Sequence, residues 1–302
     1  MAGSDAHPAR TNAGIAARVT VSASLKPEDM NGKTLPPGCV LEARNVYKVF
    51  VARGGKARTA LRNVELTIQR GEFVCLVGPS GCGKSTVLNM FAGLVTPTDG
   101  AILHDGRVIT DVNTSVGYVT QDDNLLPWRT ALSNVELALE CKGVARAERR
   151  ERASDYLARV GLKGNEELYP HELSGGMRKR VSIVRTLVDE SVDVILMDEP
   201  FGPLDAQTRL VLQDELLRLW QGTGRTIVFV THDIVEAITM SDRIAIFTGV
   251  PGSIKAVRNV TLPRPRDVFH IHETPGFSDI YDAIWNDLRE EILKERDEDG
   301  GA

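Results

Sequence analysis

The sequence predicts an α/β fold whose core is a mostly parallel β-sheet. Four short apolar runs, residues 73–77, 192–197, 226–230 and 243–247, have the length and composition of buried strands. Longer stretches of helical pattern separate most of these runs, which is the alternation typical of parallel sheets. At 302 residues the chain can hold one large or two small domains and bury a sizeable core.

Composition narrows the class of protein. Hydrophobic residues make up 42% of the chain and charged residues 25%, which is ordinary for a globular protein. The net charge of −5 argues against nucleic acid as the main partner, because no global basic field would attract a phosphate backbone. No apolar stretch approaches the ~20 residues that a transmembrane helix needs, and we expect no signal peptide. Four scattered cysteines without a C-x-x-C pair favour reduced thiols over a metal cluster.

A glycine-rich turn follows the first apolar run and precedes a helical pattern. It comprises Gly78, Pro79, Ser80, Gly81, Cys82, Gly83, Lys84, Ser85 and Thr86. In the spacing G-x-x-x-x-G-K-S, the glycines let backbone N–H groups curl around phosphate oxygens at a helix N-terminus. Lys84 would reach the β- and γ-phosphates, and the Ser85 hydroxyl would hold Mg²⁺. The alternative, a purely structural turn, is disfavoured because a strand, a turn and a helix occur in the order that phosphate binding requires.

The N-terminal part of the chain divides into two regions. Residues 1–38 are rich in Ala, Gly, Ser, Pro and Thr, and we expect a mostly disordered extension. Residues 40–46 and 64–68 alternate apolar and polar side chains, as half-buried strands do. Phe50 lies between them, and an aromatic ring there could stack on an adenine or simply pack on the sheet as a strand-end residue. Taken alone, the packing role is the more common one.

The middle of the chain looks largely helical, from residue 122 to about residue 186. A strand is expected over residues 117–120, ending at Gln121. A later helix opens after Leu173, and its start carries Ser174, Gly175 and Gly176. The N–H groups at this start are available to an anion, although the serine could also act as a plain helix cap.

Two strand ends carry polar side chains. The run 192–197 ends in Asp198 and Glu199, and a buried parallel strand delivers such acids to the carboxyl edge of its sheet. With a phosphate-binding loop upstream, Asp198 would bind Mg²⁺, and Glu199 would orient or deprotonate the attacking water. His232 follows the run 226–230 at the same edge, where it could donate a hydrogen bond to a γ-phosphate oxygen.

The remaining chain contains further elements. Asp205 can cap a helix over residues 206–220, and the run 243–247 is expected to close the sheet. A tail begins at residue 248 and contains a terminal helix. Six residues are predicted to form one apolar face of this helix: Phe277, Tyr281, Ile284, Trp285, Leu288 and Ile292.

Taken in order, these motifs resemble those of an ABC-transporter ATPase subunit. The resemblance runs from about residue 40 to residue 247 and includes the Walker A motif at 78–85, Gln121, the signature Leu-Ser-Gly-Gly at 173–176, Walker B at 195–199 and the switch residue His232. It implies a P-loop NTPase of the ABC type, with a mostly parallel sheet core and an antiparallel β subdomain. The nucleotide-binding domain would span residues 39–248, with an inserted helical subdomain at about 122–186, and the tail would span 249–302.

The resemblance also implies a site for ATP and Mg²⁺. Phe50 aligns with the aromatic that stacks on adenine, and Gln121 would sense Mg²⁺ and the γ-phosphate while touching a membrane partner. Residues 202–205 resemble the D-loop. The family works as a head-to-tail dimer, so Ser174, Gly175 and Gly176 of one subunit would face the nucleotide bound by Lys84 of the other.

Within the family, three segments resemble the nitrate, sulfonate and taurine importer ATPases. They are residues 121–130, Met177 and the stretch from 251 to 266. Two positions depart from the common pattern. Lys179 stands where glutamine is common, and Pro203 stands where alanine is usual and removes a backbone donor from the D-loop.

The resemblance therefore implies an ATP-hydrolysing subunit that energises an importer for a small anion. Its partners would be a second copy, transmembrane permease subunits and, indirectly, a solute-binding protein, with no nucleic acid. Its expected place is peripheral, at the cytoplasmic face of the inner membrane. One alternative is a soluble ABC ATPase acting on nucleic acid or ribosomes. Another is a P-loop kinase, which would not need residues 173–176 or His232.

Overall fold

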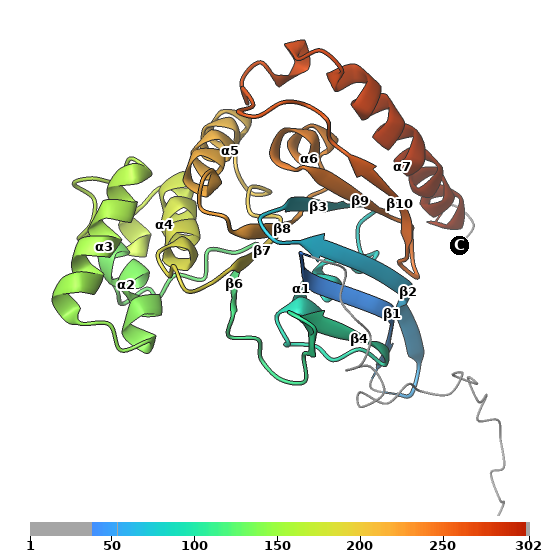
Figure 1. Cartoon of the computed structure of the whole chain (residues 1–302), viewed down its shortest axis with the longest axis horizontal. Helices are drawn as coiled ribbons and strands as arrows, with labels where there is room; N and C mark the ends of the chain where they lie inside the picture. The colour runs from blue at the N-terminus through green and yellow to red at the C-terminus, as the bar shows by residue number, and fades with distance from the viewer. Residues whose placement is uncertain (1–37, 53, 300–302) are drawn as a thin grey trace, which may run out of the picture.

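The computed structural model describes residues 38–52 and 54–299 of the chain. The predicted disordered extension lies outside the described residues except for Gly38. Two β-sheets stack at the centre, and a group of helices stands to one side of them (Figure 1). The fold is therefore of the α/β type that the sequence predicts.

The larger sheet is mostly parallel, as predicted. Its strands, in spatial order, are β10 (Ile254–Asn259), β9 (Arg243–Phe247), β3 (Phe73–Val77), β8 (Thr226–Val230), β7 (Val194–Asp198) and β6 (Val116–Val119). The strands from β9 to β6 pair in parallel, and β10 pairs with β9 in the antiparallel sense. The prediction that residues 243–247 close the sheet is wrong. Strand β10 was missed because it is a partly exposed edge strand without an apolar run.

The smaller sheet is antiparallel throughout. In spatial order it contains β2 (Ala57–Gln69), β1 (Cys39–Val51), β4 (Asp99–His104) and β5 (Arg107–Val108). Strands β1 and β2 extend beyond the predicted segments 40–46 and 64–68. Several register shifts interrupt their pairing and break the apolar alternation, so the pattern in the sequence covers only part of each strand. Phe50 consequently lies within β1, opposite Arg58 on β2.

The described residues also form seven α-helices and two 3₁₀ turns, of which the last turn and the last helix follow the final strand. They are α1 (Lys84–Phe91), α2 (Ala131–Cys141), α3 (Arg146–Arg159), η2 (Pro170–Glu172), α4 (Gly175–Leu187), α5 (Ala206–Trp220), α6 (Ile234–Met240), η3 (Ile271–Glu273) and α7 (Phe277–Asp299). Within the described residues, no helix has both the length and the apolar character needed to cross a membrane. Asp205 caps α5 by accepting hydrogen bonds from the N–H groups of Gln207 and Thr208.

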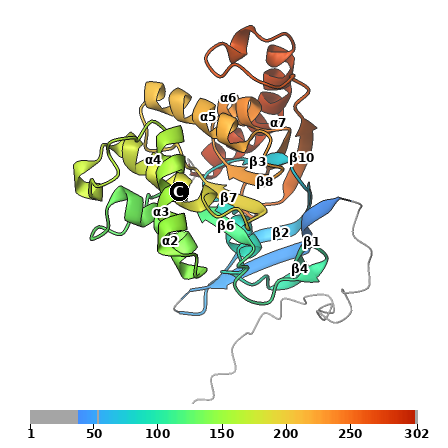
Figure 2. The same cartoon turned by 60° about the vertical axis from the view of Figure 1, so that its left-hand side comes forward.

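Helices α2, α3 and α4 form a lobe with its own apolar core beside the parallel sheet (Figure 2), and α4 joins the lobe to that sheet through Ile183 and Leu187. This lobe corresponds to the inserted helical region that was expected over residues 122–186. The region is less helical than predicted, since residues 122–130 form a loop and residues 162–169 contain turns without a helix. The apolar residues on either side of these loops belong to the lobe core, and their spacing in the sequence is helical. That spacing does not reveal where the helices end and the loops begin.

The parallel sheet is buried on both faces, so its strands read as continuous apolar runs. On β3, Phe73 and Cys75 face the core shared with α5, α6 and α7, whereas Val74 and Leu76 face α1 and the antiparallel sheet. The alternation of side chains along each strand therefore divides the interior into two cores. Helix α7 runs along the outside of β9 and β10, as Figure 1 shows.

Helix α7 packs on the domain through part of the predicted face. Phe277, Ile284 and Leu288 are buried in the core with α6. Trp285 is exposed, and the side chain of Ile292 lies outside the described side chains. The tail is thus joined to the sheet both by β10 and by α7.

The aromatic contact at the start of β3 predicts a large effect on stability. Phe73 is fully buried, and the centre of its ring lies 5.3 Å from the ring centre of Trp220 and 5.8 Å from that of Phe229. Phe73→Ala should lower the free energy of unfolding by about 3–5 kcal/mol, measured by urea denaturation. Trp128→Ala, at a 72% exposed position, is the control and should change it by about 0.5 kcal/mol or less. Equal small effects for both variants would show that this aromatic cluster does not stabilise the sheet.

Candidate functional site

Polar side chains meet at the carboxyl edge of the parallel sheet. Strand β8 pairs in parallel with both β3 and β7, so the residues that follow these three strands lie side by side. The Ser85 hydroxyl donates a hydrogen bond to Asp198 Oδ1 at 2.9 Å. His232 Nδ1 lies 3.2 Å from Glu199 Oε2. The structure thereby brings together side chains from three separate segments of the chain.

A pocket of about 370 Å³ opens at this edge. The residues that line it are Ser80, Gly81, Gly83, Lys84, Ser85, Thr86, Gln121 and Glu199. All eight are residues that the sequence placed in a nucleotide site. Gly78, Pro79 and Cys82 belong to the same loop but do not line the pocket.

The glycine-rich loop is folded around the Lys84 ammonium. Lys84 is only 5% exposed, and its Nζ donates hydrogen bonds to the carbonyls of Gly78 at 2.8 Å and Pro79 at 2.7 Å. The buried Cys82 Sγ lies 3.7 Å from the same nitrogen. Gly83 must be glycine, because its φ is +102° and an added Cβ would lie 2.5 Å from a methyl carbon of Leu61.

Asp198 lies next to the pocket and is partly buried. Burial raises the pKa of Asp198, while the hydrogen bond from Ser85 acts in the opposite direction. A partly buried carboxylate beside a hydroxyl is an oxygen donor set that suits Mg²⁺, and a cation there would offset the burial penalty. These residues therefore fit a magnesium ion.

Glu199 is held in a strained backbone conformation. Its φ is +42°, which is uncommon for a residue with a side chain. Its N–H donates to the Val230 carbonyl on the neighbouring strand, and its own carbonyl accepts from the Gly202 N–H. The turn aims the carboxylate into the pocket rather than along the strand, and strain of this kind is found where a side chain must be positioned.

Phe50 lies apart from this pocket at the end of β1. Its ring is 45% exposed, and Lys48 Nζ lies 4.9 Å from the ring centre. More than half of the residue is thus covered, and the rest is open to solvent.

The signature residues form a second pocket of about 440 Å³. Its lining is Ser174, Gly175, Gly176, Met177, Arg180, Pro203, Leu204, Asp205, Gln207, Thr208 and Val211. Ser174 caps α4 by accepting a hydrogen bond from the Met177 N–H at 3.2 Å. Gly176 allows α4 and α5 to approach, since an added Cβ would lie 2.8 Å from Thr208 Cγ2. Among the described residues, none lines both pockets, so one chain does not bring the signature to its own glycine-rich loop.

Asn134 is a functional candidate that the sequence reasoning missed. It is fully buried in α2, where its Oδ1 accepts a hydrogen bond from the Leu126 N–H and the two hydrogens of its Nδ2 are shared among the carbonyls of Leu126, Arg129 and Thr130. It thus shapes the loop that presents the exposed Trp128. The one signal in the sequence was an asparagine on an apolar helix face.

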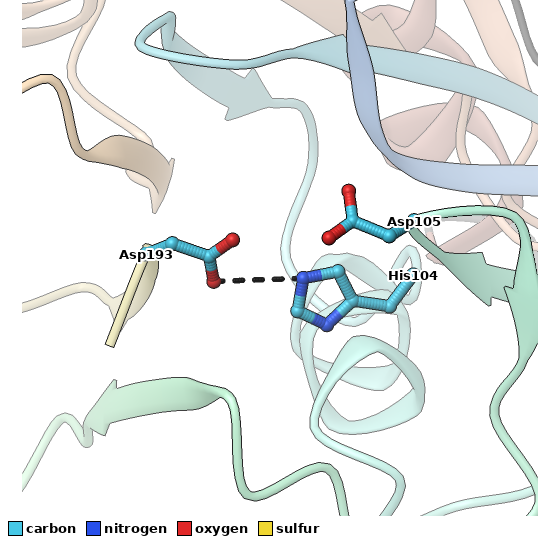
Figure 3. A group of neighbouring side chains, drawn as sticks. All are labelled: His104, Asp105 and Asp193. Atoms are coloured by element: carbon cyan, nitrogen blue, oxygen red, sulfur yellow. Dashed lines mark ion pairs between the residues drawn. The ribbon is translucent and has the colours of Figure 1, made fainter. Parts of the chain in front are cut away.

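A group of side chains elsewhere has the spacing of metal ligands (Figure 3). His104 ends β4, Asp105 follows it, and Asp193 precedes β7, with His104 Nε2 3.5 Å from Asp193 Oδ1. Arg70, however, already donates to Asp105 at 2.6 Å and to Asp193 at 2.7 Å. The guanidinium supplies the positive charge that these carboxylates require.

The tautomer of His104 also disfavours a metal ion. The Asn113 amide is fixed because its Nδ2 donates to the Phe91 carbonyl and its Oδ1 accepts from the Ser115 N–H. The same Nδ2 lies 2.9 Å from His104 Nδ1, nearer than the Asn113 Oδ1 at 3.3 Å, so Nδ1 is assigned as the acceptor. The ring proton then resides on Nε2 and leaves no lone pair for a metal. The group joins the antiparallel sheet to the parallel one.

Comparison with known proteins gives a consistent picture. A family model described as ABC transporter matches residues 61–202. An uncharacterized ABC transporter ATP-binding protein of Methanocaldococcus jannaschii is 44% identical over 254 residues, which cover 84% of this chain and 93% of the relative. The nitrate import protein NrtD of Synechocystis is 41% identical, covering 82% and 95%. The bicarbonate transport protein CmpD of Synechocystis is 43% identical, covering 78% and 84%.

A solved structure agrees with these relatives. A dimeric ATP-binding cassette in a post-hydrolysis state, bound to ADP and Pi, is 36% identical with a TM-score of 0.65, covering 73% of this chain and 98% of that one. The resemblance found in the sequence is thus confirmed at high identity over most of the chain. The chain belongs to the family of ABC transporter ATP-binding proteins, the subunits that hydrolyse ATP for transport.

Proposed function

We propose that this chain is the ATP-hydrolysing subunit that energises an ABC importer for a small anion of the nitrate, sulfonate or taurine type. The observation that carries the proposal is the cluster of Ser85, Asp198, Glu199 and His232 around the glycine-rich pocket. The transported class is supported by relatives named for nitrate import and for bicarbonate transport, both small oxyanions. Such names do not favour the alternative of a soluble ABC ATPase acting on nucleic acid or ribosomes.

The pocket offers a distinct role to each group. The backbone of residues 78–86 and the Lys84 ammonium would bind the phosphates of ATP. Ser85, Asp198 and Gln121 would hold Mg²⁺, which when bound neutralises charge on the phosphate oxygens. Each of these groups lies at the pocket or is hydrogen-bonded to a residue that lines it.

Hydrolysis would depend on Glu199 and His232. Glu199 would orient the attacking water and accept its proton. His232 Nδ1 lies beside the Glu199 carboxylate, so the ring would hold that carboxylate in place; with both ring nitrogens protonated, Nε2 would also donate a hydrogen bond to the γ-phosphate. The strained turn at Glu199 supports this role, because it fixes the base before the substrate arrives.

A second copy of the chain would complete the site. The signature pocket of Ser174, Gly175 and Gly176 is separate from the glycine-rich pocket of the same chain. In a head-to-tail dimer, each signature would close over the nucleotide of the other copy, with the exposed Phe50 ring against adenine. The similar cassette solved as a dimer supports this arrangement.

The chain would act at a membrane through other subunits. Permease subunits would dock on the loop over residues 121–130, where Trp128 is 72% exposed and Asn134 fixes the backbone. A solute-binding protein would deliver the anion to the permease. The ATPase would accordingly lie peripherally at the cytoplasmic face of the inner membrane.

Replacing the proposed base should separate ATP binding from hydrolysis. Glu199→Gln keeps the shape of the side chain but cannot accept the proton, so turnover should fall at least ~100-fold. Because ATP is still bound, a dimer should accumulate that is visible by size-exclusion chromatography only when ATP is present. Glu151→Gln, at an exposed position on α3, should behave like the unchanged protein. Turnover of Glu199→Gln at the level of that control would remove Glu199 from the catalytic role.

Replacing the loop lysine should instead weaken nucleotide binding. Lys84→Ala removes the ammonium from the pocket, and the affinity for ATP should fall at least ~10-fold in isothermal titration calorimetry. The matched control is Lys163→Ala on an exposed turn. Unchanged affinity in Lys84→Ala, with the fold intact, would contradict the phosphate-binding assignment.

Affinity capture from detergent-solubilised native membranes tests the transport role. A multi-spanning permease should co-purify with the tagged chain, and its solute-binding partner can then be screened against nitrate, bicarbonate, sulfonates and taurine. Trp128→Ala should lose the permease but retain ATPase activity in isolation, because Trp128 lies on the surface and does not line the pocket. Recovery of only ribosomes or nucleic acid would favour the soluble alternative.

A further inference from the structure

Two side chains of helix α4 form hydrogen bonds to the backbone of the segment that carries Gln121. Lys179 Nζ donates hydrogen bonds to the carbonyls of Thr120 at 3.0 Å and Gln121 at 2.8 Å. Arg185, farther along the same helix, donates to the carbonyls of Asp123 and Asn124. Four backbone carbonyls within five consecutive residues are thus bound by two cations of one helix.

The Lys179 contact is unusual because the ammonium is buried. The residue is 1% exposed, and burial lowers the pKa of Lys179 while Asp123, whose Oδ1 lies 3.8 Å from Nζ, acts to raise it. A buried cation is tolerated only where hydrogen bonds and a nearby anion stabilise it. The two carbonyls and Asp123 meet that requirement, so the side chain and the segment hold each other in place.

The segment over residues 120–124 and helix α4 line different pockets. Gln121 lines the glycine-rich pocket beside Glu199. The N-terminus of α4 carries Ser174 and Gly176, which line the signature pocket. Lys179 lies between these two ends, three residues and so slightly less than one helical turn after Gly176.

We propose that Lys179 is a positioning residue that couples the signature helix to Gln121. When the second copy's nucleotide draws the signature inward, α4 would carry the 120–124 backbone with it and set Gln121 in its own pocket. One nucleotide site would thereby influence the other within the dimer. The inference rests on the proposed function, because it assigns Gln121 to the nucleotide site.

The side-chain chemistry suits such a coupling. The packing of α4 in its lobe is provided by apolar residues, among them Val181 and Val184, whereas Lys179 ends in hydrogen bonds to backbone outside the lobe core. Glutamine, common at this position in the family that the sequence resembles, is shorter and uncharged. Lysine therefore makes a charge-assisted connection that an amide would make more weakly.

The test compares Lys179→Met with Lys163→Met, a substitution at an exposed position, in the full-length protein. The methionine retains most of the stem and removes the donor. With ATP and Mg²⁺, kcat of Lys179→Met should fall about 10-fold, while KM for ATP should change less than about 2-fold, because the phosphate-binding loop is untouched. Hydrogen exchange of the peptide over residues 116–126, measured without nucleotide, should be at least ~5-fold faster.

Each outcome decides the matter. Unchanged exchange, faster exchange with unchanged kcat, or a rise in KM alone would overturn the proposal. Absence of ATPase activity in the unsubstituted protein would contradict the proposed function instead, and exchange would still report whether Lys179 holds the segment. If Lys179→Met does not fold, Lys179→Gln replaces it and should show the same pattern with a smaller fall in kcat. Equality of Lys179→Gln with the Lys163→Met control in both measurements would also overturn the proposal.

Discussion

The parallel pairing of β8 with β3 and β7 is the constraint on which the rest of the structure depends. Parallel strands end at one edge, so three segments far apart in the sequence deliver their polar residues to the same place. The pairing is fixed by burial on both faces, with one core under α5, α6 and α7 and another under α1 and the antiparallel sheet. A one-residue slip of β7 would exchange its two faces and move Asp198 away from Ser85.

This edge concentrates polar groups where the apolar core ends. Asp198 is held partly buried with its pKa raised, and Glu199 is held in a backbone conformation that most residues avoid. Both features oppose folding, and both suit the proposed site. A cation between Ser85 and Asp198 would compensate the burial, and the strained turn keeps the base aimed at the pocket. The two apolar cores stabilise the fold and so allow it to tolerate a buried carboxylate and a strained turn.

Much of the fold and of the candidate site could be predicted because the signals are local. The glycine spacing before Lys84 and the acids directly after an apolar run require no knowledge of distant contacts. The helix predicted over residues 206–220 matches α5 for the same reason, since Asp205 provides a cap at one end. These features depend on neighbours in sequence, which a single chain displays directly.

The parts that escaped prediction depend on contacts between distant residues. Strand β10 is defined by its pairing with β9 rather than by its own composition. Lys179 could be recognised as a departure from the common residue, but its acceptors, some 58 positions away, could not be read from spacing. Asn134 likewise acts on backbone groups of a loop that has no periodic pattern. A side chain bound to carbonyls leaves no trace in the identity of the residues that accept the bond.

The loop over residues 120–130 lies between the glycine-rich pocket, the signature helix and the exposed Trp128. At its start Gln121 faces the nucleotide pocket, and Lys179 ties that start to the signature helix. At its end Asn134 ties the loop to α2, next to the exposed Trp128 that is proposed to meet the permease. Because both ends are held by hydrogen bonds to backbone, a shift of the helical lobe would displace the whole loop rather than bend it locally. The segment is only about ten residues long, and hydrogen bonds hold both of its ends. A movement at the proposed ATP site would therefore reach the surface proposed to meet the permease.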